Sequence, residues 1–156
     1  MSAYLPYLIA LGIGFVAGLR AMTAPAAVAW AAYLGWLPLA GTALGFMASV
    51  WAVGLFSLLA LVELIRDQLP GTPSRKEPAA FATRLILGGL TGACIGVLSG
   101  VLVAGLACGV LGAVLGTYVG AAVRGALAKA FGKDLPAALL EDLVAIGGAF
   151  LLVHGL

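Results

Sequence analysis

The sequence predicts an all-α, polytopic transmembrane helical bundle of about six helices, folded as a single domain over residues 1–156. Hydrophobic residues make up 63% of the chain and charged residues only 9%, whereas soluble domains carry about a quarter charged residues. The apolar runs are continuous and rich in Ala, Gly and Leu, without the two-residue alternation of a membrane β-barrel. This composition excludes a water-soluble enzyme, a nucleic-acid-binding domain and a disordered regulator.

The first two predicted helices come from apolar runs at Tyr4–Leu19 and from Ala24 to about Leu39. Together they are too long for one crossing, which needs about 20 residues. The polar break Arg20–Pro25 separates them, with Thr23 as a natural N-cap and Pro25 suited to a first helical turn. We predict two helices joined by a polar elbow. The alternative is a broken hairpin, with one crossing followed by a re-entrant half-helix.

The third predicted helix covers the apolar run Thr42–Ile65, which ends at Glu63, Arg66 and Asp67. The segment that follows, up to Pro78, contains three prolines and charges of alternating sign. Proline and clustered polar residues interrupt regular structure. We therefore predict a loop at residues 66–79.

The remaining chain predicts three more helices. Ala79–Val123 is an apolar run, interrupted by one charged residue, Arg84, and long enough for about two crossings. We expect a turn between Gly100 and Gly105. Arg124–Pro136 is predicted to be a second charged loop, and the last helix is expected to run from Ala137 to the C-terminus.

Glycines recur at four-residue spacing in the fourth and fifth predicted helices. They are Gly88, Gly92, Gly96, Gly100, Gly112, Gly116 and Gly120. Such stripes let helix backbones approach closely in a membrane. We expect the fourth helix to pack on the fifth through them; the alternative is an interface between copies in a homo-oligomer.

The distribution of basic residues predicts the topology. Two crossings separate the charged loops at residues 66–79 and 124–136, so both lie on one side, and Lys and Arg favour the cytoplasm. If residues 24–39 also cross fully, all eight basic residues of the chain face the cytoplasm and both termini lie outside.

Polar side chains that could bind a ligand gather at the predicted cytoplasmic helix ends. Glu63 and Asp67 lie one helical turn apart on one face, and the turn around Thr72–Arg75 offers hydroxyl and guanidinium donors for a phosphate. The candidate ligand-binding residues are Arg20, Thr23, Glu63, Asp67, Thr72, Ser74, Arg75, Arg84, Arg124, Glu141 and Asp142. Ionisable groups beside hydrocarbon are costly and therefore pair or line a wet cavity. The alternative is structural: arginines extend to the interface, and the turn only orders itself.

Several chemistries have no support in the sequence. His154, the only histidine, is predicted at the far end of the last helix, away from the carboxylates, so we expect no catalytic Ser–His or Cys–His pair. Cys94 and Cys108 lie in apolar runs, and we expect no disulfide. We expect no cofactor. A metal site stays open, because four carboxylates on one side could hold Mg²⁺.

Three stretches resemble a family of proteins: GLRAMTAP (Gly18–Pro25), ELIRDQLPGTPSR (Glu63–Arg75) and LLEDLVAIGG (Leu139–Gly148). They are similar to a bacterial family of small integral membrane proteins known as domain of unknown function four-one-two-six. Gln68 stands where that family tends to carry lysine. The resemblance implies a bacterial integral membrane protein, but no activity, cofactor or catalytic residue. Together with the topology above, we expect a multi-pass protein of the bacterial inner membrane.

The sequence supports three functions, of which the first is preferred. A small transporter, channel or lipid-headgroup translocator would bind an ion or an anionic lipid at the charged helix ends, since broken helices often mark substrate sites. A structural or assembly subunit would act through the glycine stripes. A membrane-embedded enzyme would act on a phosphorylated lipid. Membrane lipids are the expected partners in each case, and nucleic acid is not.

Overall fold

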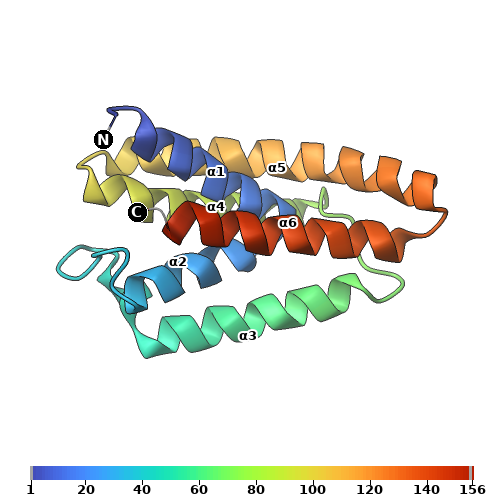
Figure 1. Ribbon diagram of the computed structural model, residues 1–156, viewed down its shortest axis with the longest axis horizontal. Coiled ribbons are helices and arrows are strands. Elements are labelled where there is room, and N and C mark those ends of the chain that lie inside the picture. The colour runs from blue at the N-terminus through green and yellow to red at the C-terminus, as the bar shows by residue number, and fades with distance from the viewer. Residues whose placement is uncertain (1, 155) are drawn as a thin grey trace.

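The computed structural model describes residues 2–154 and 156, and these residues form helices without a strand (Figure 1). The six α-helices are α1 (Leu5–Leu19), α2 (Thr23–Tyr33), α3 (Val50–Asp67), α4 (Pro78–Leu98), α5 (Leu102–Phe131) and α6 (Asp134–His154). A short 3₁₀ helix, η1 (Gly45–Ala48), precedes α3. The predicted all-α bundle of six helices is confirmed.

Three of the helices, α4, α5 and α6, are long and apolar enough to cross a membrane, and α1 is a shorter apolar helix. We therefore treat the chain as a membrane protein. The 11 residues of α2 extend only about 16 Å, well short of a hydrocarbon core of about 30 Å. In Figure 1, α2 runs in the opposite direction to α1 and lies next to α3 and α6, and both chain termini lie at the end of the bundle opposite the α3–α4 and α5–α6 connections. The first two helices thus form a short hairpin, with its connector at residues 20–22.

Two helix boundaries before α4 differ from the prediction. The second helix ends at Tyr33 instead of Leu39, and the third begins at Val50 instead of Thr42. The apolar residues between them form an irregular segment that includes η1 and two glycines, at positions 35 and 41, with φ of 81°. This conformation is open to glycine but strained for other residues. Apolar composition alone therefore overestimated both helices.

The predicted loop at residues 124–136 is also wrong. The fifth helix continues to Phe131, and only Gly132 and Lys133 connect it to α6. The segment after Arg124 is rich in Ala, Leu and Lys, which are strong helix formers. The helix ends where Gly132 adopts the left-handed conformation, with φ of 69°, a common helix C-terminus.

The core of the bundle is the close packing of α1, α4 and α5. A methyl group at Gly92 of α4 would overlap the carbonyl oxygen of Gly105 in α5 and lie 2.8 Å from the Cα of Gly109. The second stripe packs elsewhere than predicted, because Gly112 and Gly116 meet the α1 backbone at residues 11–18 instead of α4. Backbone contact of this kind requires residues without a Cβ.

Two glycines of the predicted stripes do not pack against a helix backbone. Gly100 lies beyond the end of α4, in the turn to α5, with φ of 70°, and a methyl group there would have nothing within 4 Å. Gly120 of α5 instead faces the side chains of Leu19, Arg75 and Glu141. In each stripe, the last glycine of the four-residue series therefore lies outside the contact between helix backbones.

Helix α3 lies at the edge of the bundle and packs mainly on α2 (Figure 1). Only Ala52 and Val53 among its residues are buried. The indole Nε1–H of Trp30 in α2 donates to Ser57 Oγ in α3 at 2.9 Å, which joins the two helices midway along α3. Large apolar side chains of α3, such as Trp51, Leu58 and Ile65, are exposed, as expected of a helix in contact with lipid.

Candidate functional site

Arg20 forms the centre of the polar site. It follows α1 with an extended backbone (φ −139°, ψ 108°), and it is fully buried. One terminal nitrogen lies 2.6 Å from Asp67 at the end of α3 and 2.5 Å from Asp142 of α6. Glu141 lies 3.5 Å away, and Arg20 Nε donates to Asp142 at 2.6 Å. The arginine thus holds α3 and α6 against the α1–α2 connector.

The electrostatic surroundings keep Arg20 charged. Burial disfavours the guanidinium, but the carboxylates of Glu141, Asp67 and Asp142 outweigh burial and raise the pKa of Arg20 above its ordinary value. Arginine is already protonated at any biological pH. The carboxylates therefore face a permanent positive charge.

Arg124 and Arg75 complete the pairing around the same carboxylates. Arg124 of α5 lies 2.5 Å from Asp67, 2.7 Å from Asp134 and 3.3 Å from Glu141. Arg75, from the α3–α4 loop, forms a two-point contact with Glu141 at 2.5 and 2.9 Å. Such fork-to-carboxylate contacts are the strongest and most directional ion pairs.

Glu63 joins α3 to the start of α2. Its carboxylate accepts hydrogen bonds from the backbone N–H groups of Ala21 at 2.9 Å and Met22 at 2.8 Å. Free N–H groups at a helix start favour a negative charge. Thr23 was predicted to be this cap, but Thr23 is the first helical residue and Met22 precedes it without a side-chain cap. A carboxylate 41 residues away supplies the acceptor instead.

Arg84 of α4 is buried beside the same connector. Its Nε donates to the carbonyl of Gly18 at 3.1 Å, and its terminal nitrogen lies 3.9 Å from Glu63. We refer to the residues joined by these contacts as the ion-pair cluster: Arg20, Glu63, Asp67, Arg75, Arg84, Arg124, Asp134, Glu141 and Asp142.

The hydroxyl residues of the α3–α4 loop bond within the loop. The Thr72 hydroxyl shares its one proton between the carbonyl oxygens of Arg66 and Leu69, each 2.8 Å from Oγ1. Ser74 Oγ accepts from the backbone N–H of Lys76 at 3.2 Å. These contacts shape a turn that carries Arg75 toward Glu141 of the cluster.

A cavity of about 680 Å³, the charged cavity, opens between the loop and the helix ends. Its charged lining consists of Glu63, Arg66, Asp67, Arg75, Arg84, Arg124 and Asp134. Among the described residues, Arg66 has no carboxylate within ion-pair distance. Three of the four lining arginines are paired with carboxylates of the cluster, and the donors of Arg66 are the ones open to an anion.

The acidic residues do not form a metal site in the part of the chain that the structure describes, where no three His, Cys, Asp or Glu side chains could hold an ion together. Each cluster carboxylate faces an arginine instead. The arrangement is thus suited to holding helices together and to binding an anion at its open side.

The structure brings eight of the eleven candidate residues into the cluster: Arg20, Glu63, Asp67, Arg75, Arg84, Arg124, Glu141 and Asp142. Thr72 and Ser74 line the charged cavity, whereas Thr23 lines a separate apolar groove.

Sequence reasoning missed Asp134 and Gln68 as parts of this site. Asp134 pairs with Arg124 ten residues earlier, a contact that follows once α5 continues past Arg124 and turns tightly into α6. Gln68 donates to Asp142 at 2.9 Å. No pattern in the sequence signals that second contact, because its partner lies 74 residues away.

Gly120 provides a test of how tightly the cluster is packed. A methyl group there would lie 2.5 Å from Leu19 Cδ2 and 2.9 Å from the Arg75 nitrogen. We expect Gly120→Ala to lower the free energy of unfolding by about 1–3 kcal/mol, the usual cost of overpacking. Thermal unfolding of the purified protein in detergent measures the change.

The matched control is Gly125→Ala on the same helix, where nothing lies within 4 Å of the added methyl. This change is expected to stabilise the protein by about 0.5–1 kcal/mol through helix propensity. Equal effects of the two substitutions would contradict the packing of Arg75 and Glu141 over Gly120.

Comparison with known proteins identifies a family but no activity. A family model described as "Domain of unknown function (DUF4126)" matches residues 7–155. No curated protein and no solved structure matches the chain. The matched span contains every residue of the ion-pair cluster and all six helices except two residues at the start of α1. The chain therefore belongs to the DUF4126 family of domains of unknown function.

Proposed function

We propose that the protein is a lipid-headgroup translocator, which binds the anionic headgroup of a membrane lipid in the charged cavity and moves it between the leaflets. The observation that carries this proposal is the cavity itself, in which Arg66 has no carboxylate partner among the described residues and Arg84 has only one, at 3.9 Å. A phosphate oxygen is the natural partner for a guanidinium with unused donors. The positive-inside rule supports a cytoplasmic position for this end of the bundle.

The packing of the core supports a lipid substrate over a channel for ions. The polar side chains buried deeper in α4 and α5 are Thr91 and Thr117, and both hydroxyls donate to carbonyls of their own helix. Glycine contacts close the space between α1, α4 and α5. An ion channel would need a polar path through that core, whereas binding of a lipid headgroup at the open helix ends does not.

The other two functions have weaker support. The glycine stripes proposed for an assembly role are occupied within the chain, since Gly92 meets α5 and Gly116 meets α1. A phosphatase-like enzyme would need a metal or a nucleophile, and the cluster carboxylates are engaged by arginines.

Thermal unfolding in detergent tests the binding step. Phosphatidylglycerol is expected to raise the unfolding temperature in a concentration-dependent way, by the equivalent of about 2.7 kcal/mol at 100 times the dissociation constant. Phosphatidylcholine, whose headgroup carries no net charge, is expected to give a much smaller shift. Inorganic phosphate is tested in parallel, because a free anion would use the same donors.

Arg66→Gln is the variant that tests the cavity, and Lys129→Gln is its control, since Lys129 is exposed and does not line the cavity. Arg66→Gln is expected to reduce the phosphatidylglycerol shift, while Lys129→Gln keeps it. In vesicles, the protein is then expected to speed the exchange of headgroup-labelled phosphatidylglycerol between leaflets. Equal shifts with both lipids, or a response to phosphate alone, would contradict a lipid-headgroup translocator.

A further inference from the structure

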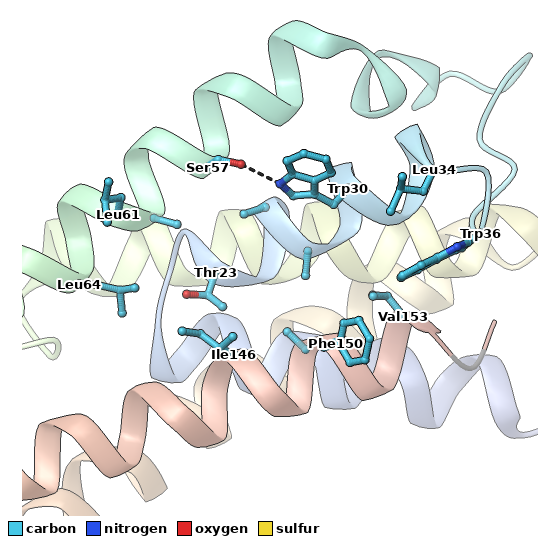
Figure 2. A pocket seen from close by; sticks show the side chains of 14 residues that line it. Thr23, Trp30, Leu34, Trp36, Ser57, Leu61, Leu64, Ile146, Phe150 and Val153 are labelled. Carbon is cyan, nitrogen blue, oxygen red and sulfur yellow. Dashed lines mark hydrogen bonds between the residues drawn. The ribbon is translucent and has the colours of Figure 1, made fainter.

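A second cavity, the apolar groove, lies between α2, α3 and α6 (Figure 2). Its volume is about 490 Å³, which is within the range of small-molecule sites. Along α2 it extends from Thr23 to Leu34, which corresponds to about 16 Å. Trp36 and Phe150 line the end of the groove opposite Thr23, as Figure 2 shows.

The groove is open toward the surroundings of the bundle. Leu61 of α3, Ile146 and Phe150 of α6 all line it and are about half exposed. The polar groups of Trp30 and Ser57 on its wall are bonded to each other. In a chain that spans a membrane, such an opening faces hydrocarbon, so an occupant with an apolar chain needs no desolvation.

Thr23 is the exception to this apolar lining. The residue is 7% exposed, and its hydroxyl has no hydrogen-bond partner among the described residues. Figure 2 shows Thr23 at one end of the groove, between Leu64 and Ile146. A buried hydroxyl without a partner is unfavourable, and a ligand with an acceptor at this end would satisfy it.

The Thr23 end of the groove adjoins the charged cavity. Met22 and Glu63 line the charged cavity, whereas their chain neighbours Thr23 and Leu64 line the groove. A lipid with its phosphate near the cluster arginines therefore has its glycerol and ester groups at the depth of Thr23, and one chain continues along the groove.

We propose that the apolar groove binds one acyl chain of an ester-linked glycerolipid, with the Thr23 hydroxyl donating to its ester carbonyl. The inference deepens the proposed function and rests on it for the lipid class. The groove selects the chain and its linkage, while the charged cavity selects the headgroup.

Tryptophan fluorescence gives a direct readout, because two of the three tryptophans, Trp30 and Trp36, line the groove. The third, Trp51, is exposed on α3 and is removed by Trp51→Phe in the full chain. In detergent, phosphatidylglycerol with brominated acyl chains is expected to quench the remaining fluorescence in a saturable way. Non-saturable quenching would overturn the proposal.

Ala60→Leu tests whether the chain occupies the groove, because Ala60 is a small lining residue. We expect this variant to weaken saturable quenching by about tenfold, equivalent to about 1.4 kcal/mol. Ala107→Leu is the matched control, because Ala107 is exposed on α5 and does not line the groove. Unchanged quenching in Ala60→Leu would overturn the assignment of the groove.

Thr23→Val tests the hydrogen bond without changing the size of the side chain. It is expected to weaken binding of the ester lipid by about two- to tenfold, the effect of one hydrogen bond. Binding of the ether analogue, which lacks the carbonyl, is expected to be equal in both proteins. An equal loss for ester and ether lipids would overturn the role of Thr23.

These experiments can contradict the headgroup site and the acyl-chain site independently of each other. Brominated phosphatidylcholine could quench as strongly as phosphatidylglycerol and lose the same share of quenching in Ala60→Leu. That result would support the groove as a chain-binding site and contradict the headgroup site. Phosphatidylglycerol could instead stabilise the protein in a way that depends on Arg66 but not on Ala60. That result would support the proposed function and overturn the groove as the site of the acyl chain.

Discussion

Arg20→Ala is expected to lower the free energy of unfolding by about 3–5 kcal/mol, because it leaves buried carboxylates without their cation. Arg20 is fully buried and lies between Asp67 and Asp142 at 2.6 and 2.5 Å. Typical total stabilities are about 5–15 kcal/mol, so this loss is a large share of the total and should lower the unfolding temperature strongly. Thermal unfolding and size-exclusion chromatography of the detergent-purified variant measure the loss.

Two further variants separate charge from geometry at this position. Arg20→Lys keeps the charge but loses the planar fork that contacts both acids, and it is expected to restore only part of the stability. Arg20→Met combined with Asp142→Asn removes charges of both signs and is expected to be more stable than Arg20→Ala. Lys129→Ala, on an exposed residue of α5, is expected to have almost no effect. An Arg20→Ala protein within about 1 kcal/mol of the parent, the typical effect of a surface ion pair, would contradict the cluster.

Gly109→Leu is expected to prevent the bundle from forming. Gly109 lies between α1 and α4: a methyl group on it would overlap the Gly88 carbonyl and lie 3.0 Å from the Cα of Gly92. On the other side, a methyl group at Gly14 would overlap the carbonyl of Gly109. Overpacking usually costs about 1–3 kcal/mol where side chains can move aside, and backbone atoms cannot.

The control for this prediction is Gly54→Leu on α3, where nothing lies within 4 Å of an added Cβ. Like Gly109→Leu, it replaces a helical glycine by leucine and adds the same side-chain volume. The two variants are compared by the yield of monodisperse protein and by the unfolding temperature. Similar yields for both would contradict the close approach of α1, α4 and α5.

The helices were predictable where the apolar pattern and the local stop signals agree. The end of α1 at Leu19 coincides with a charged break, and the end of α4 at Leu98 coincides with a glycine turn. The start of α3 was missed, because residues 42–49 are as apolar as a helix and Ser49, which caps Ala52 N–H at 3.1 Å, gives only a weak signal. In a membrane protein, hydrophobicity reports the environment of a residue more directly than its backbone conformation.

The members of the site were more predictable than their contacts. Ionisable residues are rare in an apolar chain and costly beside hydrocarbon, so each one is a candidate for a site. Glu63, Asp67 and Glu141 could therefore be identified individually from the sequence. The pairing of Arg20 with Asp142 was not, because it depends on how the hairpin and α6 meet. The groove at Thr23 was equally hidden, since α2, α3 and α6 form it jointly.

The separation of Arg20 from its partner has a consequence for biosynthesis. Arg20 and Asp142 are 122 positions apart in the chain, and at about 5–20 residues per second a ribosome needs roughly 6–24 s to make that stretch. For that time the first hairpin carries a cation whose α6 carboxylates do not yet exist. Asp67 of α3 is already present, but a buried arginine with only part of its carboxylate shell is costly, so the contacts that bury Arg20 are complete only once α6 has emerged. The last helix to be synthesised therefore supplies the final carboxylates around Arg20, and the first hairpin reaches its final packing only then.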